Sequence, residues 1–130
     1  MLQYRSLKRA RDVREQILRI CEGMNMLVES DHDSLKIKKS FLSGYFLHIA
    51  RAQKASISYQ TLMASQTVFI HPSSCLYQSN HEWIIYHELV CTSKEFMRHV
   101  INIQPEWIIE VAPHYASIHK LALENNKKQL

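Results

Sequence analysis

Residues 87–91, HELVC, come within one residue of the HExxH motif of zinc hydrolases. In that motif two histidines one helical turn apart bind the metal, and the glutamate serves as a base. Here Cys91 stands at the fifth position. The flanking residues are aromatic and β-branched and favour a strand, in which positions i and i+4 lie about 13 Å apart. We therefore predict structural roles for His87 and Cys91, and no metal site.

Other catalytic patterns are missing from the sequence. Ser73 and Ser74 lack the GxSxG context of an activated serine, and the three cysteines show neither CxxC spacing nor a local catalytic signature. Neither GxxxxGK[ST] nor GxGxxG occurs, so the chain has no P-loop or Rossmann turn of its own. We therefore predict that this chain alone is not a catalyst and binds no cofactor.

The composition predicts a globular protein with a mild basic bias. A length of 130 residues suits one domain, or one small domain and a piece of another. The formal net charge of +4 permits a phosphate-containing partner without requiring one. Three cysteines, an odd number, favour a reducing compartment. The charged start excludes a signal peptide, and no run of about 18 apolar residues could span a bilayer, so we expect a soluble intracellular protein.

Two amphipathic helices are predicted before residue 55. Within residues 2–24 apolar side chains recur at steps of three and four, and Gly23 is expected to help end the helix. The basic residues lie mostly off this stripe, which fits either a solvated surface or a face presented to nucleic acid or to an acidic domain. Residues 35–54 predict the second helix, with Ser34 as its cap. Gly44 in its middle indicates a close backbone approach or a kink.

The rest of the chain predicts strands. The expected strands are residues 57–61, 68–70, 83–91 and 96–101, the first two forming a hairpin. Pro105 starts a short helix that Pro113 stops, and the tail from Ser117 is expected to be frayed. This order predicts an α+β fold: two N-terminal helices, a small closed barrel and a short C-terminal helix. Trp83, Tyr86 and Trp107 are expected in its core.

Two polar loops interrupt the strands, at residues 71–74 and 92–94. Small barrels bind single-stranded nucleic acid through exposed loops that combine hydroxyl groups, cations and aromatic rings. The same composition also suits ordinary turns, so the loops alone leave the two interpretations open. If RNA binds here, both loops must lie on the same side of the barrel, and loops at opposite ends of the sheet would rule out the predicted RNA track.

Five segments resemble the C-terminal region of the DEAH-box RNA helicases, and of the spliceosomal members in particular. The resemblance covers about residues 2–116, in matching order and spacing. The segments are YRSLKRARDVREQI at 4–17, KSFLSGYFLHIAR at 39–51, QTVFIHPSSCLY at 66–77, EWIIYHELVCTSKEFMR at 82–98 and PEWIIEVAPHY at 105–115.

The resemblance implies a domain organisation and a parent enzyme. Residues 1–33 would be the end of a helical-bundle (ratchet) domain, residues 34–116 an oligonucleotide/oligosaccharide-binding (OB) fold with its leading helix, and residues 117–130 a tail. The parent would bind ATP and magnesium on two RecA-like domains, hydrolyse the ATP and pull single-stranded RNA through a channel that this region helps close. This chain, which lacks the motor motifs, would then be a fragment or part of a longer chain.

The resemblance also implies partners, a location and a site. The expected function is nuclear pre-mRNA splicing, and G-patch proteins activate several members of the family. The alternative is a module that docks a G-patch activator or a spliceosome scaffold, with little RNA contact. The loops would face single-stranded RNA and contact its phosphates and sugars with little sequence preference. The predicted RNA-binding residues are His71, Pro72, Ser73, Ser74, Thr92, Ser93 and Lys94, with Arg98 and Lys54 nearby in sequence.

Overall fold

The computed structural model describes residues 2–54 and 56–119. The chain divides into two compact units, Met1–His32 and Asp33–Leu130. The first contains one helix, and the second contains the barrel and the shorter helices. In the described part of the chain, no helix combines the length and the apolar character needed to cross a membrane.

The first unit contains helix α1 (Tyr4–Gly23), which confirms the first predicted helix to within two residues. Gly23 does not end it in the way that we expected. The left-handed residue is Asn25, with φ 54°. The amide of Asn25 donates to the Glu22 carbonyl, and the amide of Met26 donates to the Cys21 carbonyl, at 3.0 and 2.9 Å. These two bonds form a Schellman motif, in which asparagine tolerates the conformation that glycine usually adopts.

Helix α2 (Ser34–Tyr45) is shorter than predicted. Its cap is Asp33 rather than Ser34, because an Asp33 carboxylate oxygen accepts from the Leu35 amide at 2.9 Å. The predicted helical segment up to residue 54 is wrong beyond Tyr45, since residues 49–52 form a strand. Gly44 therefore lies next to the helix end, and a Cβ atom there would meet nothing within 4 Å. The expected close backbone approach is absent.

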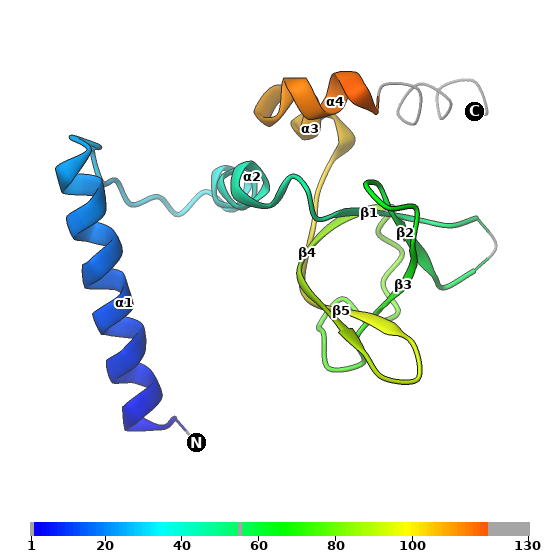
Figure 1. Cartoon of the computed structure of the whole chain (residues 1–130), viewed down its shortest axis with the longest axis horizontal. Coiled ribbons are helices and arrows are strands. Elements are labelled where there is room, and N and C mark those ends of the chain that lie inside the picture. The colour runs from blue at the N-terminus through cyan, green and yellow to red at the C-terminus, as the bar shows by residue number, and fades with distance from the viewer. Residues whose placement is uncertain (1, 55, 120–130) are drawn as a thin grey trace. The chain divides into compact units, whose positions relative to one another are not determined.

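Five strands form a closed barrel, as predicted (Figure 1). Around the barrel they follow the order β1-β2-β3-β5-β4, and only the β3–β5 pairing is parallel. The predicted hairpin of the second and third strands is confirmed. The first strand was missed, and the other four agree with the prediction to within two residues. The bounds are β1 Ile49–Ala52, β2 Tyr59–Thr61, β3 Thr67–Ile70, β4 Trp83–Cys91 and β5 Glu95–Asn102.

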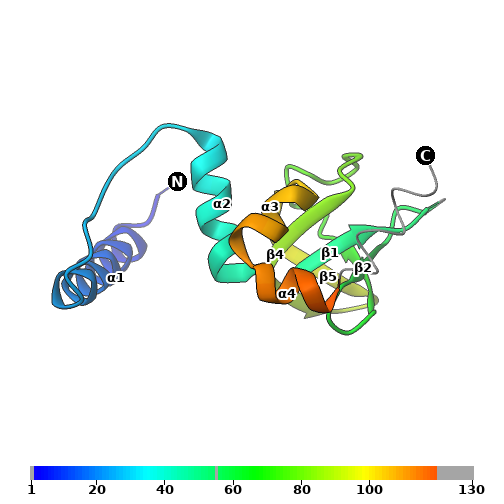
Figure 2. The ribbon, with the colours of Figure 1, turned by 90° about the horizontal axis from the view of Figure 1, so that it is seen from above.

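Helices α3 (Pro105–Val111) and α4 (Pro113–Ile118) lie over the barrel at β1 and β4, as Figure 2 shows. The first confirms the predicted short helix. Pro113, however, starts a second helix, because its fixed φ and missing donor suit a first helical position. Ser117 therefore belongs to a helix, and residues 120–130 of the expected tail lie outside the described residues.

Two hydrophobic clusters stabilise the second unit, one inside the barrel and one between the barrel and the helices. Trp83 and Tyr86 are buried as predicted, and Trp107 is partly buried against the helix-side cluster. The interior cluster is Ala50, Tyr59, Val68, Ile70, Ile84, Tyr86, Met97 and Val100. The helix-side cluster is Leu42, Ile49, Trp83, Ile85, Ile103, Ile108, Ala112, Tyr115 and Ala116.

The ladder between β4 and β5 reverses its faces halfway along. The paired residues Tyr86 and Val100 both belong to the interior cluster. So does Met97, and its partner Leu89 packs against the same cluster. Because these two pairs are three residues apart, simple alternation would place them on opposite faces. The reversal coincides with His99, which has φ 55°.

Candidate nucleic-acid interface

The loop at residues 71–74 is held together by its own hydrogen bonds. The His71 amide donates to the Met97 carbonyl at 3.0 Å, which ties the loop to β5. His71 Nδ1 accepts from the Ser73 amide at 3.1 Å and lies 2.7 Å from the Ser73 hydroxyl oxygen. A nitrogen that accepts carries no hydrogen, so the hydroxyl donates as well, and the imidazole holds its hydrogen on Nε2. The loop thus presents an imidazole N–H, while the Ser73 hydroxyl is already engaged.

The remaining loop residues differ in their availability. Pro72 is exposed, and Ser74 is half-buried. The Ser74 hydroxyl oxygen accepts from the Leu76 amide at 3.2 Å, so it stabilises the next turn. The Ser73 hydroxyl, the predicted donor in this loop, is therefore engaged with His71, whereas the Ser74 hydroxyl accepts a bond and keeps its own hydrogen.

The turn at residues 92–94 is the tip of the β4–β5 hairpin. The Thr92 amide donates to the Lys94 carbonyl at 3.0 Å, and Thr92, Ser93 and Lys94 are all exposed. The ammonium nitrogen of Lys94 lies 4.4 Å from the centre of the Phe69 ring. This distance is within the range of a cation–π contact.

Two half-buried phenylalanines connect the loops. Phe69 and Phe96 are paired across β3 and β5, with ring centres 6.3 Å apart. The His71 ring meets Phe96 edge-on at 5.6 Å. Together Phe69, His71, Lys94 and Phe96 form what we call the aromatic strip. The two phenylalanines were not predicted as site residues, although Phe69 lies between the inward-facing Val68 and Ile70 and must therefore face outward.

The two loops share a side of the barrel but not an end of its strands. Residues 71–74 follow the C-terminal end of β3, and residues 92–94 precede the N-terminal end of β5. Because β3 and β5 are parallel, the loops leave the pair at opposite ends. The pairing of β3 with β5 is only two residues long, so the two loops begin a short distance apart. The ring contacts of Phe96 with Phe69 and with His71 therefore connect the residues next to the two loops. This arrangement contradicts the predicted track, which placed the two loops together at one end of the sheet. A nucleic-acid track here would instead follow the strip.

Arg98 and Lys54, the two cations predicted from their places in the sequence, lie on segments next to the 71–74 loop. Arg98 directly follows Met97, whose carbonyl accepts from the His71 amide. Arg98 is half-buried on β5 opposite Glu88, two residues beyond Phe96. Within residues 2–54 and 56–119 it has no ion-pair partner. Lys54 is exposed in the connection between β1 and β2. The pairing of Tyr59 with Val68 puts that connection at the end of β3 where residues 71–74 begin.

The HELVC segment lies in β4, which confirms the predicted strand. His87 and Cys91 are both exposed and four residues apart along it. No group of three histidine, cysteine or acidic side chains placed to hold a metal ion occurs in the parts of the chain that the structure describes.

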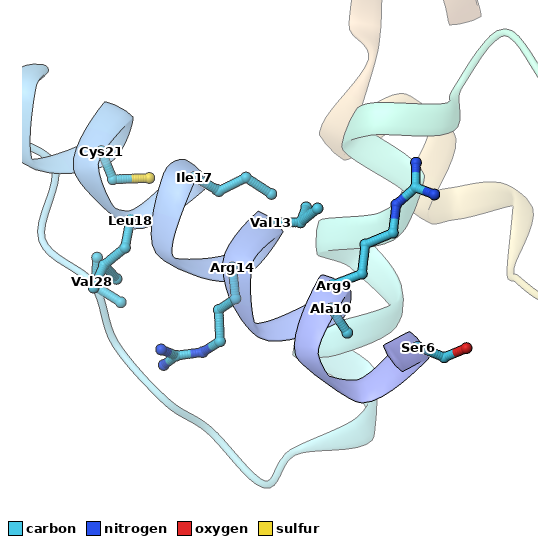
Figure 3. Close-up of a pocket in the computed structure, with 9 residues that line it drawn as sticks. All are labelled: Ser6, Arg9, Ala10, Val13, Arg14, Ile17, Leu18, Cys21 and Val28. Carbon is cyan, nitrogen blue, oxygen red and sulfur yellow. The ribbon is translucent and has the colours of Figure 1, made fainter. Parts of the chain in front are cut away.

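The first unit, taken by itself, carries an apolar groove along α1 (Figure 3). The groove measures about 730 Å³ and includes Val28, which follows the helix and lies beside Leu18. No residue of α1 is buried, and Ile17 is 55% exposed. Arg9 and Arg14 flank the apolar line. An apolar helix face of this kind usually packs against another element.

Comparison with known proteins places this barrel in a family. A family model described as oligonucleotide/oligosaccharide-binding (OB)-fold, OB_NTP_bind, matches residues 37–115. The fold is also similar to part of the E. coli DExH-box NTPase HrpB, with a TM-score of 0.54 and 17% sequence identity over 75% of this chain. The chain spans 12% of the length of that NTPase. The match to the family model covers more than half of the chain, which therefore belongs to the OB_NTP_bind family of OB-fold domains.

Proposed function

We propose that this chain is the C-terminal accessory region of an ATP-dependent DEAH-box RNA helicase that acts in nuclear pre-mRNA splicing. In this proposal the barrel contacts single-stranded RNA and helps close the channel through which the RNA passes. Three things support it: membership of the OB-fold family, a fold shared with part of a DExH-box NTPase, and the segments that resemble DEAH-box helicases. The observation that carries the RNA contact is the aromatic strip.

The strip combines the groups that bind single-stranded RNA without reading its sequence. Phosphates attract the Lys94 ammonium, and the exposed hydroxyls of Thr92 and Ser93 can donate to phosphate or sugar oxygens. A base can stack on an aromatic face whatever its identity, so Phe96 and Phe69 suit such contacts, and at Phe69 the base would replace the Lys94 ammonium that lies over the ring. We therefore expect binding that depends on salt and varies little between RNA sequences.

The proposed partners within the parent chain are a ratchet domain and two RecA-like domains. The apolar groove of α1 supports the ratchet domain as a partner, because a helical bundle of that kind would bury the apolar face of the helix. ATP and magnesium would bind to the RecA-like domains, since this sequence has no P-loop.

RNA binding can be tested with the whole chain of 130 residues and fluorescently labelled oligouridylate and oligoadenylate. We expect the double variant Ser93→Ala/Lys94→Ala to bind both oligomers more weakly than the wild type. Lys39→Ala is the control, because that ammonium is paired with Glu110 at 2.7 Å. Equal affinity of the wild type and the double variant would remove the 92–94 turn from the site.

The alternative function is a docking module for a G-patch activator or a scaffold protein. The α1 groove favours it, because Val13, Ile17 and Ile20 are each about half exposed on one helix. Titrating the chain with a G-patch peptide and, separately, with RNA distinguishes the two functions. Peptide binding that Ile17→Ser abolishes, together with no RNA binding, would favour docking.

A further inference from the structure

A second candidate binding site lies between α2 and the β4–β5 ladder. This pocket measures about 370 Å³, and its lining includes Ile85 and Ile101. Its walls carry two aromatic rings from α2, Phe41 and Tyr45, and two imidazoles, His87 from β4 and His99 from β5. Neither the family match nor the predicted RNA loops assign a role to these four side chains.

Two polar groups of the pocket, Tyr45 and His87, are held in place by hydrogen bonding. The Tyr45 hydroxyl and His87 Nδ1 share a hydrogen bond of 3.1 Å, and the His87 and His99 ring centres are 5.9 Å apart. Behind them His48 stacks on Tyr86 at 5.0 Å. His48 Nδ1 lies 3.1 Å from both the Tyr86 and the His87 carbonyl oxygens and donates to them. The wall of the pocket is thus fixed before any ligand arrives.

His99 is the least constrained polar group of the pocket. Its side chain is exposed and has no hydrogen-bond partner among the residues that the structure describes. Its backbone is left-handed, with φ 55°, at the point where the ladder reverses its faces. Left-handed non-glycine residues concentrate at functional sites. The reversal leaves the imidazole beside the pocket instead of inside the barrel.

The shape and chemistry of this pocket suit a flat ring with hydrogen-bonding edges. Unstacked RNA bases are typically bound between aromatic side chains, histidine included, with their edges hydrogen-bonded. The volume lies within the range of small-ligand pockets, at roughly 300–1,000 Å³. A base would find ring faces in Phe41 and Tyr45, and imidazole nitrogens in His87 and His99.

The pocket also continues the aromatic strip. His99 is three residues beyond Phe96 on β5, about 10 Å along the strand. Arg98 lies between them, half-buried and without an ion-pair partner in the described residues. An RNA strand that follows the strip would therefore bring a phosphate to Arg98 and the next unstacked base to the pocket.

We propose that this pocket binds one base of the RNA strand that follows the aromatic strip, with Arg98 at the phosphate between them. The inference rests on the proposed function, because it needs RNA on the strip. The pocket could instead take an apolar side chain of a protein, but the imidazole pair and the neighbouring unpaired arginine favour a base with its phosphate.

The test compares oligouridylate with an abasic ribose-phosphate oligomer of equal length on the whole chain. Phe41→Ala should be tolerated by the fold, because Phe41 is 48% exposed. His99→Asn removes the imidazole but suits the left-handed backbone. We expect Phe41→Ala to weaken oligouridylate binding about five- to tenfold, in line with the loss of one stacking contact. We expect His99→Asn to weaken it about fivefold, in line with the loss of one hydrogen bond to the base. Binding of the abasic oligomer should not change.

Two controls separate this inference from the proposed function. Ile37→Ala changes an equally exposed residue one turn earlier on α2, outside the pocket, and should bind RNA as the wild type does. Phe41→Tyr should restore binding. If Lys94→Ala weakens binding while Phe41→Ala and His99→Asn do not, RNA follows the strip but the pocket holds no base. That result would overturn this inference and would favour a protein side chain as the occupant of the pocket. If the wild type binds no RNA, both proposals fail.

Discussion

The ammonium group of Lys94 lies 4.4 Å from the centre of the Phe69 ring, so the tip of the β4–β5 hairpin rests on the outer face of β3. The contact joins the long lysine side chain to Phe69, whose neighbours along β3, Val68 and Ile70, point into the barrel. It places a cation beside an aromatic ring, and proteins that bind single-stranded RNA combine these two kinds of group. The first prediction follows from this cation.

Replacing Lys94 with alanine should weaken RNA binding by a similar factor for oligouridylate and oligoadenylate. The slope of log K against log salt should fall by about one unit, because one phosphate contact is lost. Fluorescence anisotropy at several salt concentrations measures both quantities. A loss confined to one sequence would show that Lys94 reads a base instead.

Replacing Ile108 with alanine should destabilise the second unit by about 2–5 kcal/mol, because the side chain is fully buried and its loss leaves a cavity. Its neighbour Ile109 is 57% exposed and provides a matched control. Ile109→Ala should change the free energy of unfolding by about 0.5 kcal/mol or less. Urea denaturation measures both. Similar losses in the two variants would mean that α3 does not pack on the barrel through Ile108.

Replacing Asp33 with alanine should cost about 1 kcal/mol of stability, because the Leu35 amide loses its acceptor. Ser34→Ala should have little effect, since Ser34 is the first residue of the helix and not its cap. Thermal unfolding followed by circular dichroism compares the two variants. A larger loss of stability in Ser34→Ala than in Asp33→Ala would show that Ser34 is the cap, as the sequence predicted.

Alkaline pH should destabilise the second unit. Burial raises the pKa of Tyr59, Tyr86 and Tyr115, and for Tyr115 the charge of Tyr86 adds to the effect. Tyrosines in the unfolded chain ionise near pH 10, at about their ordinary pKa, whereas the folded ones hold their protons longer. The stability is thus fully present below about pH 10 and is lost as the pH rises through the folded pKa values. Urea denaturation between pH 8 and 11 measures the loss.

Tyr115→Phe is the variant for that experiment. The Tyr115 hydroxyl is buried and has no hydrogen-bond partner among the described residues. Removing it should leave the stability at pH 8 unchanged or raise it by about 1 kcal/mol, because an unsatisfied buried group is lost. The variant should also lose less stability at high pH than the wild type. A large destabilisation at pH 8 would show that the hydroxyl has a partner.

The sequence predicted most of the barrel because its strands are marked by local signals. Residues 83–91 begin with the aromatic and β-branched run WIIY and contain Val90, and this strand agrees in both bounds with the structure. The strand Ile49–Ala52 was missed because the helical periodicity of α2 continues through it. Only its pairing with both β2 and β4 makes it a strand. Such long-range pairing leaves no trace in a local pattern.

The candidate site was predicted less completely than the fold. The loops at 71–74 and 92–94 were found from their polar residues, but the rings that connect them were not. Phe69 and Phe96 meet because β3 and β5 are neighbours and their register pairs these two residues, and pairing between such distant segments is a property of the topology. The reversal at His99 is equally hidden, since it appears only in the left-handed backbone.

The most direct test of the RNA site is the ¹H–¹⁵N NMR spectrum of the whole chain, recorded with and without an oligouridylate of about 12 nucleotides. Such an oligomer is within the site size of one OB fold, about 4–16 nucleotides. We expect the amide shifts to concentrate in residues 69–71 and 92–99, on the two sides of the Lys94–Phe69 contact. No shifts, or shifts confined to α1, would contradict RNA binding by the barrel.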